Sequence, residues 1–168
     1  MKNLLVTNYI FLTGVLERPA VPPNVEEVSY KLFVTGGSGV GKTATISRLA
    51  GNKSPSTYTE TQGIMKTNVY WPVKIWDKII MFKLHFWEAG ENSSRKYSHI
   101  TSACESKADG IVFMFSYMDK SSFSDLQQMM SKMLHGSEGP TGIVIGTRFV
   151  LFKKSLFPFY CFVNFEFC

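Results

Sequence analysis

The chain has 168 residues, which is the length of one domain with short extensions and argues against two domains. Hydrophobic residues make up 45% and charged residues 18%, a balance that excludes a disordered or fibrous chain. The net charge of +5 favours anionic partners but is too small to predict a nucleic-acid-binding protein. The three cysteines, Cys104, Cys161 and Cys168, lack CxxC spacing, so we expect no zinc site, no disulfide framework and a cytoplasmic location.

The chain begins with an extension, residues 1–28, whose proline-rich segment PAVPP is best interpreted as a stiff linker. A folded domain is expected over residues 29–148. Its first strand, at 30–35, ends at two glycines, and a helix follows from Lys42 to about residue 50. The polar residues 52–63 are expected to form a loop. No segment reaches the roughly 18 to 20 apolar residues that a transmembrane helix needs.

Strands and helices alternate through the rest of this domain. Alternating apolar residues predict two strands, 64–75 and 79–87, joined by a hairpin turn around Asp77 and Lys78. A loop and a helix follow within 90–107, and GIVFMFSY at 110–117 is typical of a central parallel strand. Ser121 or Ser122 is the expected cap of a helix that ends near Leu134, and GIVIGT at 142–147 is another buried strand. The order predicts an α/β fold with a mainly parallel sheet.

A phosphate-binding loop lies between the first strand and the first helix. Its sequence GGSGVGKT satisfies the pattern GxxxxGK[ST]. The glycines let backbone N–H groups and the helix N-terminus face a polyphosphate, Lys42 would reach the terminal phosphates, and the Thr43 hydroxyl would bind Mg²⁺. The residues expected to contact nucleotide here are Gly36, Gly37, Ser38, Gly39, Val40, Gly41, Lys42, Thr43 and Ala44. Binding of a nucleoside triphosphate is therefore the strongest prediction.

The order of segments after this loop resembles the Ras/Rab-like small GTPases. Thr61, within TQGI, lies where the family's switch I threonine completes the Mg²⁺ shell. Several segments together resemble the REM- and Rab-like small GTPases associated with the ciliogenesis and planar polarity effector complex: LERPAVPP, SYKLFVTGGSGVGKTA, TQGI, YWPVKI, IIMFKLHFWEAGE and VFMFSYMDKSSF. The resemblance implies a three-layer P-loop fold that binds GTP or GDP with Mg²⁺. It also implies effector-complex partners and roles in cilium assembly, planar cell polarity and targeted vesicle transport or exocytosis, at the basal body and cytoskeleton.

The family's DxxG segment is altered in this chain. Gly90 matches, but Trp87 occupies the position of the aspartate that holds Mg²⁺ indirectly, and Glu88 is the substitute we expect. Glu91 occupies the place of the glutamine that orients the attacking water, and a carboxylate there cannot donate a hydrogen bond and repels phosphate. Intrinsic hydrolysis is expected to be slow. The catalytic candidates are thus Lys42, Gly90 and Glu91, and the metal candidates are Thr43, Thr61 and Glu88. The other interpretation of Glu88 and Glu91 is a pair of surface carboxylates at a helix N-terminus.

The family's NKxD box, which selects guanine, is also altered. Thr147 and Arg148 stand in place of Asn and Lys, and both are candidate nucleotide contacts, while Val150 lacks the acceptor of the family's Asp. Residues 149–168 contain seven of the fourteen phenylalanines and resemble neither the last strand nor the last helix of a small GTPase. We expect a shortened form lacking both elements. Its tail either packs irregularly on the body or contacts a membrane through its aromatic residues and two lysines.

Three functions remain open on the sequence alone. The first is an Mg²⁺-dependent GTP-binding switch with slow turnover. The second is a pseudo-GTPase scaffold of the ciliogenesis and planar polarity effector complex that works without hydrolysis, which Trp87, Glu91 and Val150 favour. The third is an ATPase or small-molecule kinase on the same loop. That third function needs a carboxylate at the end of an apolar strand, and Asp119 is its one candidate, whose alternative role is helix capping.

Overall fold

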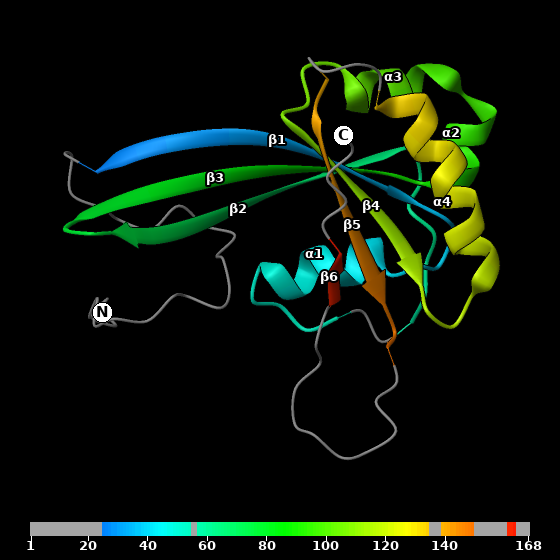
Figure 1. Ribbon diagram of the computed structural model, residues 1–168, viewed down its shortest axis with the longest axis horizontal. Helices are drawn as coiled ribbons and strands as arrows, with labels where there is room; N and C mark the ends of the chain where they lie inside the picture. Colours follow the sequence, from blue (N-terminus) through cyan, green and yellow to red (C-terminus); the bar gives the residue numbers. More distant parts are fainter. Residues whose placement is uncertain (1–24, 55–56, 135–138, 150–160, 164–168) are drawn as a thin grey trace.

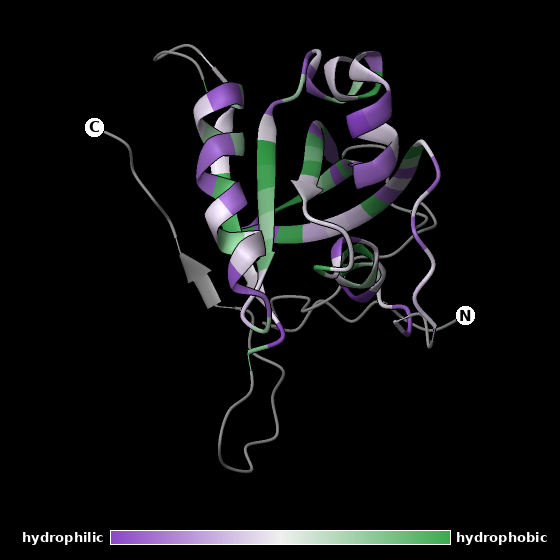
Figure 2. Cartoon of the chain, turned by 90° about the vertical axis from the view of Figure 1, so that its right-hand side faces the viewer, coloured by the Kyte–Doolittle hydropathy of each residue, from purple (hydrophilic) through white to green (hydrophobic). Residues whose placement is uncertain are grey.

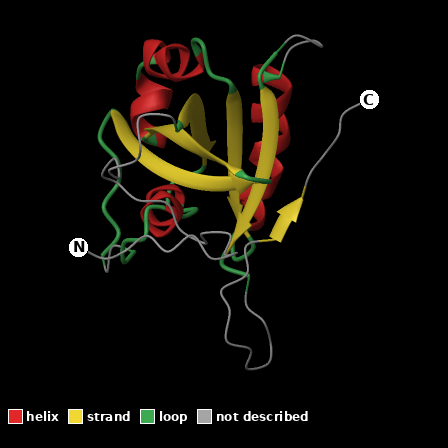
Figure 3. Ribbon diagram, turned by 90° about the vertical axis from the view of Figure 1, so that its left-hand side faces the viewer, coloured by secondary structure: helices red, strands yellow, loops and turns green. Residues whose placement is uncertain are grey.

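A computed structural model describes residues 25–54, 57–134, 139–149 and 161–163, and they form one six-stranded sheet with helices on both faces (Figures 1 and 3). The strand order is β2-β3-β1-β4-β5-β6. The elements are β1 (Glu26–Gly36), α1 (Lys42–Leu49), β2 (Ile64–Ile75), β3 (Lys78–Ala89), α2 (Glu91–Lys96), α3 (Ser98–Glu105), β4 (Gly110–Ser116), α4 (Lys120–Met133), β5 (Thr141–Thr147) and β6 (Cys161–Val163).

The centre of the sheet is parallel, as the alternation of strands and helices predicts. Strand β1 pairs in parallel with β3 and β4, and β4 pairs in parallel with β5, while β2 is antiparallel to β3. The predicted P-loop fold of a small GTPase is confirmed. The sequence predicted no strand beyond β5, whereas the three-residue β6 pairs there, antiparallel to β5. No helix follows β5 among the residues that the structure describes.

Two apolar clusters hold the helices on the sheet. On one face, Phe33 and Phe113 pack with Leu126 and Met130 of α4, so this side of α4 belongs to the core. On the other face, Val34 and Met114 pack with residues of α1. All seven residues of β4 are buried, because this strand has helices over both faces. Figure 2 shows the apolar colour concentrated on the strands and the polar colour on the outer faces of the helices.

Several boundaries differ from those predicted. Strand β1 begins at Glu26, inside the segment interpreted as an extension, because its first residues pair with β3 from Ile80 onward. Figure 1 shows β1, β2 and β3 reaching well beyond the helices. The hairpin turn lies at Trp76 and Asp77, one residue earlier than expected, and Trp76 takes a φ of 57°. The segment 90–107 forms two helices, because the backbone at Tyr97 is extended between α2 and α3.

The cap of α4 is Asp119, not one of the two serines. Its Oδ1 accepts hydrogen bonds from Ser121 N at 3.0 Å and Ser121 Oγ at 2.6 Å, and these bonds lower the pKa of the Asp119 carboxyl. Ser122 Oγ instead donates to the Asp119 carbonyl and accepts from Ser116 N. Asp119 therefore has the capping role. Its carboxylate is not among the residues that line the cavity described below.

The stability of this fold depends strongly on Phe113, whose side chain is fully buried between β4 and α4. We predict that Phe113→Ala lowers the free energy of unfolding by about 3–5 kcal/mol, because it removes apolar contacts and leaves a cavity. Urea unfolding of the full chain, followed by circular dichroism, measures this loss. Gln128→Ala on the exposed side of α4 is the control, with an expected change within about 0.5 kcal/mol. Equal effects of the two substitutions would contradict the assignment of the core.

Candidate functional site

A cavity of about 290 Å³ opens at the carboxyl ends of β1 and β3. In open α/β sheets this edge is where ligands bind. The cavity brings together three segments that are distant in the sequence: the phosphate loop, the loop before β2 and the start of α2. Its lining consists of Ser38, Gly39, Gly41, Lys42, Thr43, Ala44, Thr57, Tyr58, Thr59, Glu60, Thr61, Glu88, Gly90, Glu91 and Arg148. Most of the predicted site residues are in this set, while Gly36, Gly37, Val40 and Thr147 are not part of the lining.

The phosphate loop takes a conformation that requires glycine at both of its ends. Gly36 has a φ of 146°, and a Cβ there would lie 2.2 Å from the Met114 carbonyl oxygen on β4. Gly41, which precedes α1, has a φ of 103°. Both values lie in a region that residues with side chains rarely adopt. The loop therefore turns sharply out of β1 and leads directly into the N-terminus of α1, as a phosphate-binding loop does.

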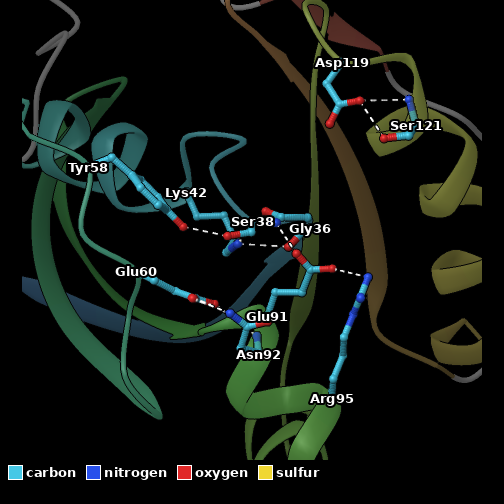
Figure 4. Close-up of polar contacts among 11 residues, drawn as sticks. Gly36, Ser38, Lys42, Tyr58, Glu60, Glu91, Asn92, Arg95, Asp119 and Ser121 are labelled. Carbon is cyan, nitrogen blue, oxygen red and sulfur yellow. Dashed lines mark hydrogen bonds and ion pairs between the residues drawn. The ribbon is translucent and has the colours of Figure 1, made fainter.

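Lys42 is a buried cation inside this loop. Its side chain is 7% exposed, and Nζ donates hydrogen bonds of 2.9 Å to the carbonyl oxygens of Gly36 and Gly37 (Figure 4). Burial lowers the pKa of Lys42 from its ordinary value of 10.5, while the nearby carboxylates of Glu88, Glu91 and Glu60 raise it in part. A buried ammonium group of this kind is suited to an anionic ligand, which would compensate the lost hydration of the charge.

Glu88 is a buried carboxylate that meets both candidate metal-binding threonines. The side chain is 1% exposed, and Oε1 accepts hydrogen bonds from Thr43 Oγ1 at 2.6 Å and Thr61 Oγ1 at 2.9 Å. The second oxygen, Oε2, is buried without a hydrogen-bond partner. Hard cations such as Mg²⁺ prefer carboxylate and hydroxyl oxygens. The unpartnered oxygen and the two hydroxyls therefore fit a Mg²⁺ ion, which Thr43, Thr61 and Glu88 would hold.

Strand alternation explains why Glu88, and not Trp87, faces this cavity. Neighbouring residues on β3 point to opposite faces of the sheet. The Trp87 ring faces away, with Lys31 Nζ at 4.0 Å and Lys66 Nζ at 3.8 Å from its centroid. Lys31 Nζ also donates to the carbonyl oxygens of Ala103 and Ser106 at the end of α3. Trp87 thus has a structural role, and the carboxylate one residue later reaches the site.

The loop before β2 and the start of α2 are in direct contact. A Cβ on Gly90 would lie 1.9 Å from the Thr61 carbonyl oxygen, so only glycine fits there. Gly90 N donates to the Gly63 carbonyl at 3.1 Å, and Gly63 N donates to Ser93 Oγ at 2.9 Å. Sensing of a phosphate by the Gly90 amide would require exchange of its bond to Gly63. The side chain of Glu60 adds bonds to Asn92 N and Nδ2.

Glu91 contacts the phosphate loop directly. Its Oε2 accepts a hydrogen bond from Ser38 N, and its Oε1 forms an ion pair with Arg95, one turn later on α2, at 2.5 Å (Figure 4). Ser38 Oγ is also 2.6 Å from Tyr58 Oη, which brings the loop before β2 to the same point. Glu91 therefore occupies a donor that a bound phosphate would use.

Thr147 and Arg148 support the phosphate loop from β5. Thr147 Oγ1 donates to the Val40 carbonyl at 2.5 Å and lies 3.1 Å from the Phe115 carbonyl, while Arg148 donates to the Gly39 carbonyl at 2.6 Å. Arg148 lines the cavity, but Thr147 is buried behind it. Val150 lies outside the described residues.

Sequence reasoning missed Tyr58, Glu60, Asn92 and Arg95. One signal was available for Arg95, because Glu91 and Arg95 are four residues apart in a segment predicted to contain a helix. The other contacts join segments that are distant in sequence and depend on how the loops fold over the cavity. No spacing rule identifies them.

Comparison with known proteins agrees with this geometry. Residues 31–156, well over half of the chain, match the profile of the Ras family. The chain belongs to the Ras family. The assignments of Thr61 as the family's switch I threonine and of Gly90 as the DxxG glycine stay predictions. The other predicted features of the site, including Glu88 as a metal ligand, stay predictions.

The relatives include proteins named for cilia. The chain is 44% identical over 140 residues to "Ciliogenesis and planar polarity effector 2" of Mus musculus, covering 81% of this chain and 54% of that protein. It is 44% identical over 139 residues to the Xenopus laevis protein of the same name, covering 80% and 56%. To "Ras-related protein Rab-13" of Rattus norvegicus it is 33% identical over 121 residues, covering 71% and 56%. The predicted resemblance is confirmed, and the chain spans a little over half the length of these relatives.

Within the described part of the chain, no helix has both the length and the apolar character required to cross a membrane.

The Mg²⁺ site leads to a prediction about stability. With GTP present in excess, Mg²⁺ should raise the melting temperature of the wild-type chain, because metal and nucleotide bind the folded state. Glu88→Gln should raise the Mg²⁺ concentration needed for half of that effect by about tenfold or more, because it removes the anionic ligand. Thermal unfolding over a Mg²⁺ series measures both. The control is Glu60→Gln, whose native oxygens bond to Asn92, and an equal loss in both variants would contradict the role of Glu88.

Proposed function

We propose that this Ras-family chain is an Mg²⁺-dependent guanine-nucleotide-binding switch with slow GTP hydrolysis. The observation that carries the proposal is the buried Glu88 carboxylate, whose unpartnered oxygen lies with the Thr43 and Thr61 hydroxyls beside the phosphate loop. A buried anionic oxygen without a donor is costly unless a cation compensates it. A Mg²⁺–nucleotide complex would supply that cation and would place phosphates beside Lys42.

Each segment of the site has a role in this proposal. The N–H groups of the phosphate loop and the Lys42 ammonium bind the phosphates. Thr43, Thr61 and Glu88 would hold Mg²⁺, which neutralises phosphate charge when bound. Thr61 and Gly90, which already touch, join the two loops that a terminal phosphate would order. Partner proteins would then recognise the ordered surface of these loops.

Slow hydrolysis follows from the chemistry of Glu91. An ionised carboxylate accepts hydrogen bonds but cannot donate one to orient water toward the phosphate. Its contact with Ser38 N also places negative charge at the rim of the phosphate loop. The expected activity is therefore that of a switch that stays in its triphosphate form until a partner supplies what Glu91 lacks.

The cellular role is proposed from the relatives. The names of the proteins from Mus musculus and Xenopus laevis support a role in ciliogenesis and planar polarity, with effector proteins of that system as partners. The similarity to a Rab-related protein supports a role in targeted vesicle transport or exocytosis. The location that fits these roles is the cytoplasm near the basal body of the cilium and the cytoskeleton. The membrane contact predicted for residues 149–168 falls mostly on residues 150–160 and 164–168, which lie outside the described residues.

A second candidate is a scaffold that does not hydrolyse GTP. It is favoured by the Glu91 carboxylate, which bonds to a phosphate-loop amide, and by the contacts that join the switch loops through Glu60, Asn92 and Ser93. A chain of this type would present its loops to a partner regardless of nucleotide. Partner binding that is identical with GTP, with GDP and without nucleotide would favour the scaffold over the switch.

The guanine preference is tested by comparing nucleotides. We expect the purified chain with Mg²⁺ to bind GTP and GDP more tightly than ATP in calorimetry. Val150→Asp restores the acceptor of the family's box and should widen the preference for GTP over ATP by about tenfold, because a charged acceptor pairs with guanine N–H groups. Equal affinity of the wild-type chain for GTP and ATP would contradict guanine selection.

The role of Lys42 is tested by Lys42→Met, which keeps much of the side-chain volume. Loss of a charged hydrogen-bonding group should weaken GTP binding by about 1.5–3 kcal/mol, which is tenfold to more than a hundredfold.

A second consequence of the burial of Lys42 concerns pH. The pKa of Lys42 is lowered by burial, so the unfolded chain binds more protons than the folded chain as pH rises toward 10.5. The free energy of unfolding of the wild-type chain, relative to that of Lys42→Met, should therefore increase over that alkaline range, as measured by urea unfolding. A flat difference would contradict burial of the charge.

A further inference from the structure

Glu91 has two partners, and they lie on opposite sides of its carboxylate. One oxygen accepts from Ser38 N in the phosphate loop, and the other is 2.5 Å from Arg95 (Figure 4). Glu91 is 21% exposed and lines the cavity, whereas the Arg95 side chain is 72% exposed and is not part of the lining. Arg95 thus touches the cavity only through Glu91.

The charges of the residues that line the cavity leave the Glu91 carboxylate to repel a phosphate ligand. The described lining residues carry three carboxylates, Glu60, Glu88 and Glu91, against two cations, Lys42 and Arg148. Bound Mg²⁺ would compensate Glu88, and Glu60 bonds to Asn92. Glu91 remains, at the position of the residue that orients the water attacking the terminal phosphate. The Glu91 carboxylate repels the third phosphate of a triphosphate more strongly than it repels the two phosphates of a diphosphate. The third phosphate would lie nearer to it, and repulsion between like charges falls with distance.

We propose that Arg95 is a positioning residue that lets the site accept a triphosphate despite Glu91. When a terminal phosphate takes the Ser38 N–H, the Glu91 carboxylate keeps Arg95 as its partner, turned away from the phosphate loop. The guanidinium neutralises the carboxylate and holds its orientation from outside the cavity. Arg95 in this way sets the preference for triphosphate over diphosphate. The inference rests on the proposed nucleotide-binding function and extends it to a residue outside the cavity.

The geometry of α2 makes this pairing specific. Glu91 begins the helix and Arg95 follows by four residues, the spacing at which a carboxylate and a guanidinium share one face. Lys96, the next residue, carries the same charge but lies over the ring of Tyr97, with Nζ 5.3 Å from the centroid. The substitution Lys96→Ala is therefore a matched control, because it removes one positive charge from the same short helix and leaves Arg95, the partner of Glu91, in place.

A double-mutant cycle tests the proposal. The full-length chain, Arg95→Ala, Glu91→Gln and the double variant are titrated in Mg²⁺ with guanosine 5′-(β,γ-imido)triphosphate and with GDP. Arg95→Ala is expected to weaken triphosphate binding by about fivefold and GDP binding by less than about twofold. In the Glu91→Gln background the same substitution should change triphosphate binding by less than about twofold, because the carboxylate that needs compensation is gone.

Two controls separate this role from a merely structural one. Arg95→Lys keeps the charge and should restore triphosphate affinity to within about twofold, and Lys96→Ala should leave it within the same range. Equal losses for Arg95→Ala in both backgrounds would mean that Arg95 contacts phosphate itself, and equal losses for GDP and triphosphate would mean a disturbed helix. Either of these results, or an unchanged triphosphate affinity in Arg95→Ala, overturns the proposal for Arg95. None of them contradicts the proposed binding of nucleotide. A wild-type chain that binds neither nucleotide overturns the proposed function and this inference together.

Discussion

The central constraint in this molecule is the burial of two opposite charges at the carboxyl edge of the sheet. Lys42 is buried by the turn out of β1 and donates hydrogen bonds to its carbonyl oxygens, and Glu88 is buried at the end of β3 and accepts a hydrogen bond from Thr43 of α1. Burial of charge is costly, so these side chains are stable only where their partners are fixed. The glycines of the phosphate loop, the contact of Gly90 with Thr61 and the support from Thr147 all serve to fix those partners.

A shift of one residue on β3 changes the chemistry of the site without changing the fold. The sequence predicts Trp87 at the position of the family's aspartate, and strand alternation turns its ring toward Lys31 and Lys66 on the other face of the sheet. Glu88, the next residue along the strand, faces the cavity and accepts hydrogen bonds from Thr43 and Thr61. The same segment leads into α2, where Glu91 and Arg95 bring a paired charge to the phosphate loop. One short segment therefore contains both Glu88, the candidate metal ligand, and Glu91, the carboxylate beside the expected position of the terminal phosphate.

The fold and the phosphate loop could be predicted from the sequence because both depend on local patterns. Each of these patterns lies within about ten residues of the sequence: the apolar run of β4, the glycines at 36–41 and the alternation of apolar residues along β3. The strand β6 and the start of β1 at Glu26 could not be predicted, since both depend on pairing with distant strands. The contacts of Tyr58, Glu60 and Asn92 also join separate loops. The sequence allowed Asp119, Ser121 or Ser122 as the N-cap of α4. The choice of Asp119 depends on the extended backbone at residue 119, which the sequence does not show.

The central claim is that buried Glu88, Thr43 and Thr61 form a Mg²⁺ site that makes nucleotide binding depend on the metal. Calorimetric titration of the wild-type chain with GTP, once in excess Mg²⁺ and once in EDTA, tests it most directly. The account predicts clear binding with Mg²⁺ and an affinity at least about tenfold weaker in EDTA, because repulsion between the phosphates and the buried Glu88 carboxylate is then uncompensated. Equal affinity under both conditions would contradict the account, since Lys42 and the loop amides would then bind phosphate without help from the metal.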